Sequence, residues 1–157
     1  MDAFDVDGPT VAMARANVAA AGLEDRVQVH RVDAADPGAG GSYELVCAFE
    51  CIHDLPDPVA VLASMASLVG DRGTVIVMDE AVADSFSPEA GPIDQVMYGF
   101  SLMFCLPDSL SHDHSVGTGT VMRPDTLRSY ARQAGFSSVE VLPIENDFFR
   151  FYRLHRR

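Results

Sequence analysis

The sequence contains no lysine, because all 11 basic residues of this 157-residue chain are arginines. This absence excludes every mechanism that needs a lysine amine, including a Schiff base, a phosphate-loop lysine and the lysine of protein kinases. Positive charge is also scarce, since 23 acidic residues give a net charge of −12. An acidic surface repels phosphate backbones, so we expect no nucleic acid partner.

Long apolar runs are missing as well. The longest runs, such as 102–106, are far shorter than the ~20 residues of a membrane helix, and no signal-peptide pattern is present. We therefore expect no membrane partner and a cytoplasmic location. Three cysteines, Cys47, Cys51 and Cys105, lack the spacing of zinc or redox sites, which favours free thiols; Cys47 and Cys51 are expected to be small buried residues.

The pattern of apolar residues predicts an alternation of strands and helices within one domain covering 1–157. Strands are expected at 3–6, 26–32, 44–49, 74–78, 137–144 and 148–154, and helices at 9–21, 59–69, 93–105 and 124–134. The nearly continuous apolar run at 44–49 is typical of a parallel strand buried on both faces. The sequence therefore predicts a doubly wound α/β fold with a mostly parallel sheet, a C-terminal antiparallel hairpin and an insertion or lid at 81–122.

Acidic residues follow several of the expected strands, notably Asp5, Asp33, Glu50 and the pair 79–80. In a parallel sheet, ligands bind beyond the carboxyl ends of the strands, so these acids stand where a ligand is expected. His53 follows the strand at 44–49 and is the best candidate for a general base, since an imidazole titrates at about 6.5. For each of these residues, a solvated turn or loop position is the alternative.

Two segments of the insertion allow more than one interpretation. His112, Asp113 and His114 carry metal-binding groups, but neighbouring side chains point apart in an extended chain and no fourth ligand is evident, so we expect no metal. A lid that contacts a substrate fits them better. The segment 97–105 is apolar on nearly every side, which indicates either a buried helix or an interface.

Five short motifs occur in order along nearly the whole chain: Phe4-Asp5-Val6-Asp7, Val32-Asp33-Ala34, the segment 49–55 and the turns at 68–74 and 134–136. Together they resemble the class I S-adenosylmethionine-dependent methyltransferases, in particular the bacterial branch that modifies small molecules. This resemblance implies a Rossmann-like fold, S-adenosylmethionine as the cofactor and methyl transfer to a small organic acceptor.

The resemblance also implies roles for individual residues. Asp5 and Val6 would bind the ribose of the cofactor, and Asp33 and Ala34 would bind its adenine. Phe49 and Glu50 would border its methionine part, and His53 would accept a proton from the methyl acceptor. Tyr98, Phe104 and His112 would shape the acceptor pocket.

The sequence departs from this family at its front. The family opens with a strand and a glycine-rich loop, whereas no Gly-x-Gly-x-Gly occurs here. That strand lies between the second and fourth strands of the family's sheet, so its absence exposes unpaired backbone edges. We therefore expect a fold truncated at the N-terminus, from a truncated gene or an internal start at Met1.

Two other functions are alternatives to methyl transfer. The first is a catalytically inactive fragment that associates with a partner chain or with a second copy as a homodimer, through the apolar segment 97–106. The second is a nicotinamide-dependent oxidoreductase, which shares the layer architecture. It is disfavoured because its Gly-x-Gly-x-x-Gly signature is absent too.

Overall fold

The computed structural model describes residues 1–36, 38 and 42–156. Contacts within the chain group it into two compact units, Met1–Ala39 (unit 1) and Gly40–Arg157 (unit 2). Each unit is described by itself. The interpretation of 81–122 as an insertion within a single domain stays a prediction.

Unit 1 is a β-α-β element. Strand β1 (Asp2–Asp5) leads through helix α1 (Gly8–Ala20) to strand β2 (Gln28–Arg31), and β1 pairs with β2 in parallel. Asp7 caps the helix, because its Oδ2 accepts a hydrogen bond of 2.8 Å from the backbone N–H of Thr10. Val11 is the one buried residue of α1, so little of this helix contributes to a core.

Unit 2 contains the larger sheet and the remaining helices. Its strands are β3 (Tyr43–Phe49), β4 (Val69–Glu80), β5 (Ser138–Val141) and β6 (Phe149–His155), and its helices are α2 (Pro58–Leu68), α3 (Pro92–Phe100), α4 (Leu106–Leu110) and α5 (Pro124–Gln133). The sheet has the order β3-β4-β6-β5, with β3 parallel to β4 and β6 antiparallel to both of its neighbours. This arrangement confirms the predicted α/β fold and its C-terminal antiparallel hairpin.

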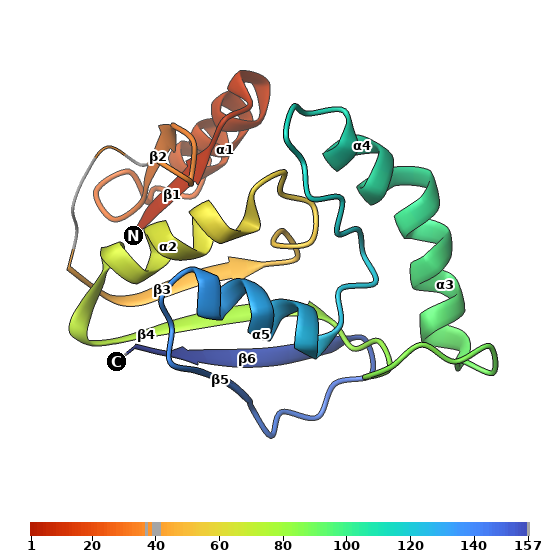
Figure 1. Cartoon of the computed structure of the whole chain (residues 1–157). Coiled ribbons are helices and arrows are strands. Elements are labelled where there is room, and N and C mark those ends of the chain that lie inside the picture. The colour runs from red at the N-terminus through yellow and green to blue at the C-terminus, as the bar shows by residue number, and fades with distance from the viewer. Residues whose placement is uncertain (37, 39–41, 157) are drawn as a thin grey trace. The chain divides into compact units, whose positions relative to one another are not determined.

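The core of unit 2 lies between the sheet and two helices. Figure 1 shows α2 and α5 on one face of the four-stranded sheet. The apolar stripe predicted for the helix at 59–69 is buried there, with Leu62 fully covered and Val61 6% exposed. Val75 and Val77 of β4 and Tyr152 of β6 meet this stripe from the sheet, all of them at most 1% exposed. Removal of this apolar surface from water is the main stabilising term of the unit.

The expectation that the strand at 44–49 is buried on both faces is wrong. Leu45 and Phe49 are 57% and 53% exposed, and Cys47 between them is exposed as well. Because side chains alternate along a strand, these three residues share one face of β3, the face opposite to buried Ala48. The expectation that Cys47 is a buried residue fails for the same reason.

Strand β3 is also paired along one edge only. Among the described strands, β3 pairs with β4 and β1 pairs with β2, and the two sheets are separate. Each of these strands therefore carries backbone groups along one edge that no described strand satisfies.

The apolar segment at 97–105 is not a buried helix. Helix α3 passes into a π-helical segment, η1 (Ser101–Cys105), which continues into α4. Met97 and Ser101 are buried, whereas Leu102, Met103 and Phe104 are 72%, 67% and 58% exposed. The burial alternative is therefore wrong for most of the segment, and the interface alternative stays a prediction. Within the described residues, no helix combines the length and hydropathy that a membrane span requires.

Candidate functional site

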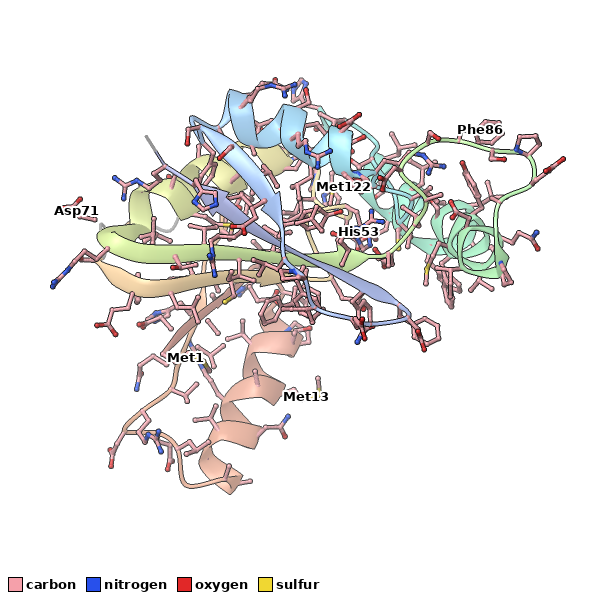
Figure 2. The ribbon with its side chains drawn as sticks, turned by 90° about the horizontal axis from the view of Figure 1, so that it is seen from below. Met1, Met13, His53, Asp71, Phe86 and Met122 are labelled. Atoms are coloured by element: carbon pink, nitrogen blue, oxygen red, sulfur yellow. The ribbon has the colours of Figure 1, made fainter. Side chains whose placement is uncertain are left out.

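The carboxyl ends of two parallel strands bring a group of titratable side chains together in unit 2. His53 lies in the turn after β3, and Asp79 and Glu80 are the last residues of β4. Since β3 and β4 run in parallel, both strands end at the same edge of the sheet, and the turn therefore meets the end of β4. Figure 2 shows His53 in the interior of the unit, whereas Phe86 lies on the outer loop. We call His53, Asp54, Asp79, Glu80 and Cys105 the His53 cluster.

The imidazole of His53 is held on its Nδ1 side by buried carboxylates. Nδ1 lies 2.7 Å from Oδ1 of Asp79, within hydrogen-bond distance, and 3.3 Å from Oε2 of Glu80. The side chains of His53, Asp79 and Glu80 are 3%, 0% and 8% exposed. A carboxylate at Nδ1 fixes the orientation of the ring and directs Nε2 toward the remaining side of the cluster.

These carboxylates shift the proton equilibria of the cluster. Burial by itself would lower the pKa of His53, but its contacts with Asp54 and Asp79 and the charges of Asp79 and Glu80 outweigh that effect and raise the pKa to about 12. Burial and the neighbouring Asp79 raise the pKa of Glu80 to about 9. At neutral pH the imidazole and the Glu80 carboxyl group are therefore both protonated.

On the Nε2 side, His53 faces Asp54 and Cys105. Oδ1 of Asp54 lies 3.1 Å from Nε2, in an ion pair that lacks the alignment of a hydrogen bond. The Asp54 side chain is 40% exposed, so this side of the ring is the one nearer to solvent. His53, Asp54 and Cys105 each offer a metal-ligand atom, and these atoms lie within 4.8 Å of one another, as do those of His53, Asp79 and Glu80. Either set could hold a cation, but the ion pairs already account for the arrangement.

A loop of the segment 111–123 covers the turn that carries His53. The backbone N–H of Gly119 donates to the carbonyl of His53 at 3.1 Å, and the N–H of Val116 donates to the carbonyl of Pro56 at 3.0 Å. Gly119 has φ +71, and a Cβ on this residue would lie 2.3 Å from Oγ of Ser101. Only glycine can be accommodated where the loop backbone lies this close to Ser101. The loop therefore packs closely between the π-helical segment and the turn that carries His53.

The candidate ribose and adenine ligands lie in unit 1. Asp5 ends β1 and Asp33 follows β2, so both stand at the carboxyl ends of parallel strands, as predicted. Each carboxylate uses its Oδ1 in a local turn, accepting from the N–H of Asp7 at 2.7 Å and of Ala35 at 2.8 Å. A carboxylate has further acceptor capacity, so this local role is compatible with binding hydroxyl or amino groups. Beside them, Val6 is exposed and Ala34 half-buried.

Phe49 and Glu50 lie at the end of β3 in unit 2. Glu50 has φ 54, a left-handed conformation that is uncommon for a residue other than glycine, and its N–H donates to the carbonyl of Met78. Such strained positions are frequent at binding sites. Both side chains are exposed. These residues belong to unit 2, whereas Asp5 and Asp33 belong to unit 1, and their roles in cofactor binding stay predictions.

Of the predicted acceptor residues, none is among the described contacts of His53. The hydroxyl of Tyr98 accepts a hydrogen bond of 3.0 Å from Arg123, and its ring meets Phe86 edge-on. Phe104 packs against Phe100 and is 58% exposed. His112 is exposed in the turn after α4. Their roles in acceptor binding stay predictions. His112, Asp113 and His114 form no metal-ligand group among the described residues.

His53 was predicted as a site residue, and Asp79 and Glu80 were expected at the ligand-binding edge of the sheet, but the contacts between them were not predicted. Asp79 and Glu80 carried a usable signal, because they close the strand next to the one that precedes His53. The signal for Asp54 was weaker, because it consisted only of its position next to His53 in the sequence. No local signal in the sequence predicted that Cys105 lies near His53, since its position depends on how the helical segment 92–110 packs on the turn.

A family model described as "Methyltransferase domain" matches residues 3–141. The chain belongs to this methyltransferase family. The predicted resemblance is thereby confirmed, and the oxidoreductase alternative is not supported.

Solved structures give the same fold. The chain is 25% identical to an O-methyltransferase from neocarzinostatin biosynthesis, which was crystallised with S-adenosyl-L-homocysteine and 1,4-dihydroxy-2-naphthoic acid, with a TM-score of 0.70 over 99% of this chain and 42% of that one. An O-methyltransferase family protein from Burkholderia thailandensis matches with 19% identity, a TM-score of 0.70 and 43% of its length covered. The mitomycin 7-O-methyltransferase matches with 16% identity, a TM-score of 0.68 and 41% covered. The chain thus spans less than half the length of these relatives.

Proposed function

We propose that this chain transfers the methyl group of S-adenosylmethionine to a phenolic hydroxyl of a small aromatic acceptor, with the charged imidazolium of His53 stabilising the acceptor as a phenolate. The observation that carries the proposal is the buried pair of His53 and Asp79, joined at 2.7 Å at the carboxyl edge of a parallel sheet. Membership in the methyltransferase family and the naphthoic acid bound by the neocarzinostatin enzyme support the reaction class and the acceptor. The reaction fits the expected cytoplasmic location.

The residues of unit 1 fit the cofactor. Asp5 and Asp33 end parallel strands, and their carboxylates can accept hydrogen bonds from the ribose hydroxyls and the adenine amino group. Glu50, strained at the end of β3, is a candidate for the amino group of the methionine part. The cofactor, when bound, supplies a methyl group on a positively charged sulfur.

The role of His53 follows from where its proton rests. The pKa of His53, about 12, lies above the value near 10 of a phenol such as the tyrosine side chain. At neutral pH the ring is therefore already an imidazolium and cannot accept a second proton, so the predicted general-base role does not apply. When a phenolic hydroxyl occupies the Nε2 side, the positive charge of the imidazolium lowers the pKa of the phenol, and its proton passes to water and leaves a phenolate. The oxygen lone pair forms the new bond to the methyl carbon, the carbon–sulfur bond breaks, and the sulfur keeps its electron pair as a neutral thioether.

The neighbouring carboxylates stabilise the positively charged form of His53. Asp79 at Nδ1 stabilises the imidazolium that faces the phenolate, and burial strengthens this attraction because the local dielectric constant is low. Beyond the proton, methyl transfer needs mainly alignment of the attacking oxygen with the methyl group. An aliphatic alcohol holds its proton more tightly than a phenol, so it would be a poor acceptor at this site.

The proposal is tested by incubating the chain with methyl-labelled S-adenosylmethionine and 1,4-dihydroxy-2-naphthoic acid. Label is expected in an aryl methyl ether. His53→Ala should lower kcat on the order of a hundredfold or more, the range for the loss of one preorganised donor to an oxyanion. Its matched control, His155→Ala, changes a histidine at the end of β6 that pairs with Glu140 outside the cluster, and turnover should stay within about twofold of wild type. Equal turnover of His53→Ala and wild type would remove the assigned role.

A further inference from the structure

Arg123 and Asp94 form a buried ion pair outside the His53 cluster. Arg123 is the residue directly before α5, and Asp94 lies in the first turn of α3. Nη1 of Arg123 lies 3.6 Å from Oδ1 of Asp94, and the two side chains are 16% and 6% exposed. Removing two charges from water costs free energy, so other contacts of these side chains must offset that cost.

Both side chains of the pair hold the backbone of Ala83, in the loop after β4. The N–H of Ala83 donates to Oδ2 of Asp94 at 2.9 Å, and Nη1 of Arg123 donates to the carbonyl of Ala83. Nη2 of Arg123 donates to the hydroxyl of Tyr98 on α3 at 3.0 Å. We call Ala83, Asp94, Tyr98 and Arg123 the Arg123 clamp. The clamp ties together the loop after β4, helix α3 and the start of α5, which lie at one end of the four-stranded sheet (Figure 1).

The Arg123 clamp also connects α3 to the segments that lead into the His53 cluster. Ala83 follows Glu80, the last residue of β4, by three positions. Arg123 ends the segment 111–123, in which the N–H of Gly119 donates to the carbonyl of His53. Helix α3 is therefore attached on two sides to segments that contact or carry the cluster, and the clamp helps to fix its position relative to His53.

The clamped loop and helix bring two exposed aromatic rings together. Phe86 of the loop meets Tyr98 edge-on, with 6.4 Å between the ring centroids, and the two residues are 70% and 40% exposed. Because the oxygen of Tyr98 accepts from Arg123, the hydroxyl proton of Tyr98 is available to a further acceptor. Aromatic rings beside a hydroxyl donor suit an aromatic ligand that carries an oxygen substituent, and the nearby guanidinium favours a negatively charged one.

We propose that Arg123 is a positioning residue, which together with Asp94 holds Tyr98 where its hydroxyl donates to the carboxylate of an aromatic methyl acceptor. This inference rests on the proposed function for the identity of the acceptor. The clamp itself is independent of catalysis. Loss of the clamp weakens binding of the acceptor and leaves the proposed ligands of the cofactor unchanged.

The kinetic test compares Arg123→Met with the matched control Arg128→Met. Arg128 lies on α5 and forms an ion pair with Asp125 at the surface, where such a pair contributes little. Arg123→Met should raise KM for 1,4-dihydroxy-2-naphthoic acid about tenfold or more, the range of one hydrogen bond to a charged group, while kcat changes less than about threefold. Arg128→Met should stay within about twofold of wild type in both constants. An unchanged KM in Arg123→Met would overturn the proposal.

The role of the carboxylate is tested with 1,4-dihydroxynaphthalene, which has the same ring system without that group. Its KM should agree within about twofold between wild type and Arg123→Met, because the contact with Tyr98 is missing in both. Tyr98→Phe keeps the ring and removes the hydroxyl, so it should raise KM for the naphthoic acid as Arg123→Met does. An equal rise of KM for both compounds in Arg123→Met would contradict the recognition of a carboxylate.

A double variant keeps the test valid if the single variant loses its fold. Arg123→Met leaves the buried carboxylate of Asp94 without a partner charge, which lowers stability. The double variant Arg123→Met/Asp94→Asn removes both charges. Its KM for the naphthoic acid should equal that of Arg123→Met, because both substitutions break the same clamp and their effects are not additive. A KM near wild type in the folded double variant would contradict the positioning role.

Hydrogen exchange tests the clamp without turnover. The exchange rate of the Ala83 amide, followed by NMR, reports its hydrogen bond to Asp94. Exchange should be on the order of tenfold faster in Arg123→Met, or in the double variant, and unchanged in Arg128→Met. Unchanged exchange in both folded variants contradicts the clamp whatever the turnover. A wild-type chain without methyl transfer, but with accelerated exchange in the variants, contradicts the proposed function and supports the clamp.

Discussion

At the scale of single residues, the proposed reaction depends on the proton held by His53 and on the carboxylates that keep it there. The pKa values of His53, about 12, and Glu80, about 9, are both raised in the folded chain. Both groups therefore bind a proton more tightly in the folded state than in the unfolded state. Their contribution to stability is complete at low pH and is lost as pH rises.

This linkage predicts a pH dependence of stability. In the unfolded chain Glu80 loses its proton near pH 4.5 and His53 near 6.5, whereas both keep it in the folded chain up to about 9. The free energy of unfolding should therefore fall as pH rises from 6.5 to 9, by at most about 1.4 kcal/mol per pH unit for each group. Urea unfolding at several pH values measures the slope.

The Glu80→Gln variant is the control for that slope. It keeps a polar side chain that does not titrate, so its free energy of unfolding should depend less steeply on pH than that of wild type between 6.5 and 9. An identical slope in the variant would show that Glu80 is not protonated in the folded chain.

At the scale of elements, the loop that covers His53 tests how tightly the site is built. Gly119→Ala places a Cβ 2.3 Å from Oγ of Ser101 in a backbone conformation with φ +71. The free energy of unfolding of the variant should be about 1–3 kcal/mol lower than that of wild type, because a side chain is strained at this position and the loop must shift. Methyl transfer should fall too, since the shift moves the turn that carries His53.

Gly99→Ala is the matched control. Gly99 lies in α3, has no positive φ and has open space where a Cβ would stand. Alanine should stabilise the helix by about 0.5–1 kcal/mol. Thermal unfolding of the two variants compares them directly; a Gly119→Ala variant as stable as Gly99→Ala would contradict the close approach of the loop.

The elements differ in how far their bounds and burial could be predicted from the sequence. Helix α2 was predicted within one residue at each end because its apolar stripe is a local signal, whereas its cap, Asp57, was not predicted. The burial of β3 was predicted wrongly, because a continuous apolar run indicates only that a strand can be covered on both faces, whereas coverage depends on other elements. The π-helical segment and Cys105 could not be predicted, since their positions depend on long-range packing.

At the scale of the whole molecule, the two units differ in how much they can stabilise themselves. Unit 1 has a two-stranded sheet and one helix with a single buried residue, whereas unit 2 contains nearly all of the buried core. Units of about 40 residues rarely bury enough surface to be stable alone.

Hydrogen exchange should therefore distinguish the units. Backbone amides of β4 and β6 are expected to exchange only at global unfolding, while amides of β1 and β2 exchange through local opening, at least about tenfold faster. Equal protection in both units, measured by mass spectrometry of peptides, would show that unit 1 is stabilised as strongly as unit 2.

The most direct test of the central claim is calorimetric titration of the 157-residue chain with S-adenosylmethionine and then with S-adenosylhomocysteine. Both compounds are expected to bind saturably, and Asp5→Ala should weaken binding about tenfold or more, because a carboxylate that accepts two hydrogen bonds is lost. His53→Ala, outside the proposed cofactor ligands, should bind as wild type does. A folded chain that binds neither compound would contradict methyl transfer by this chain.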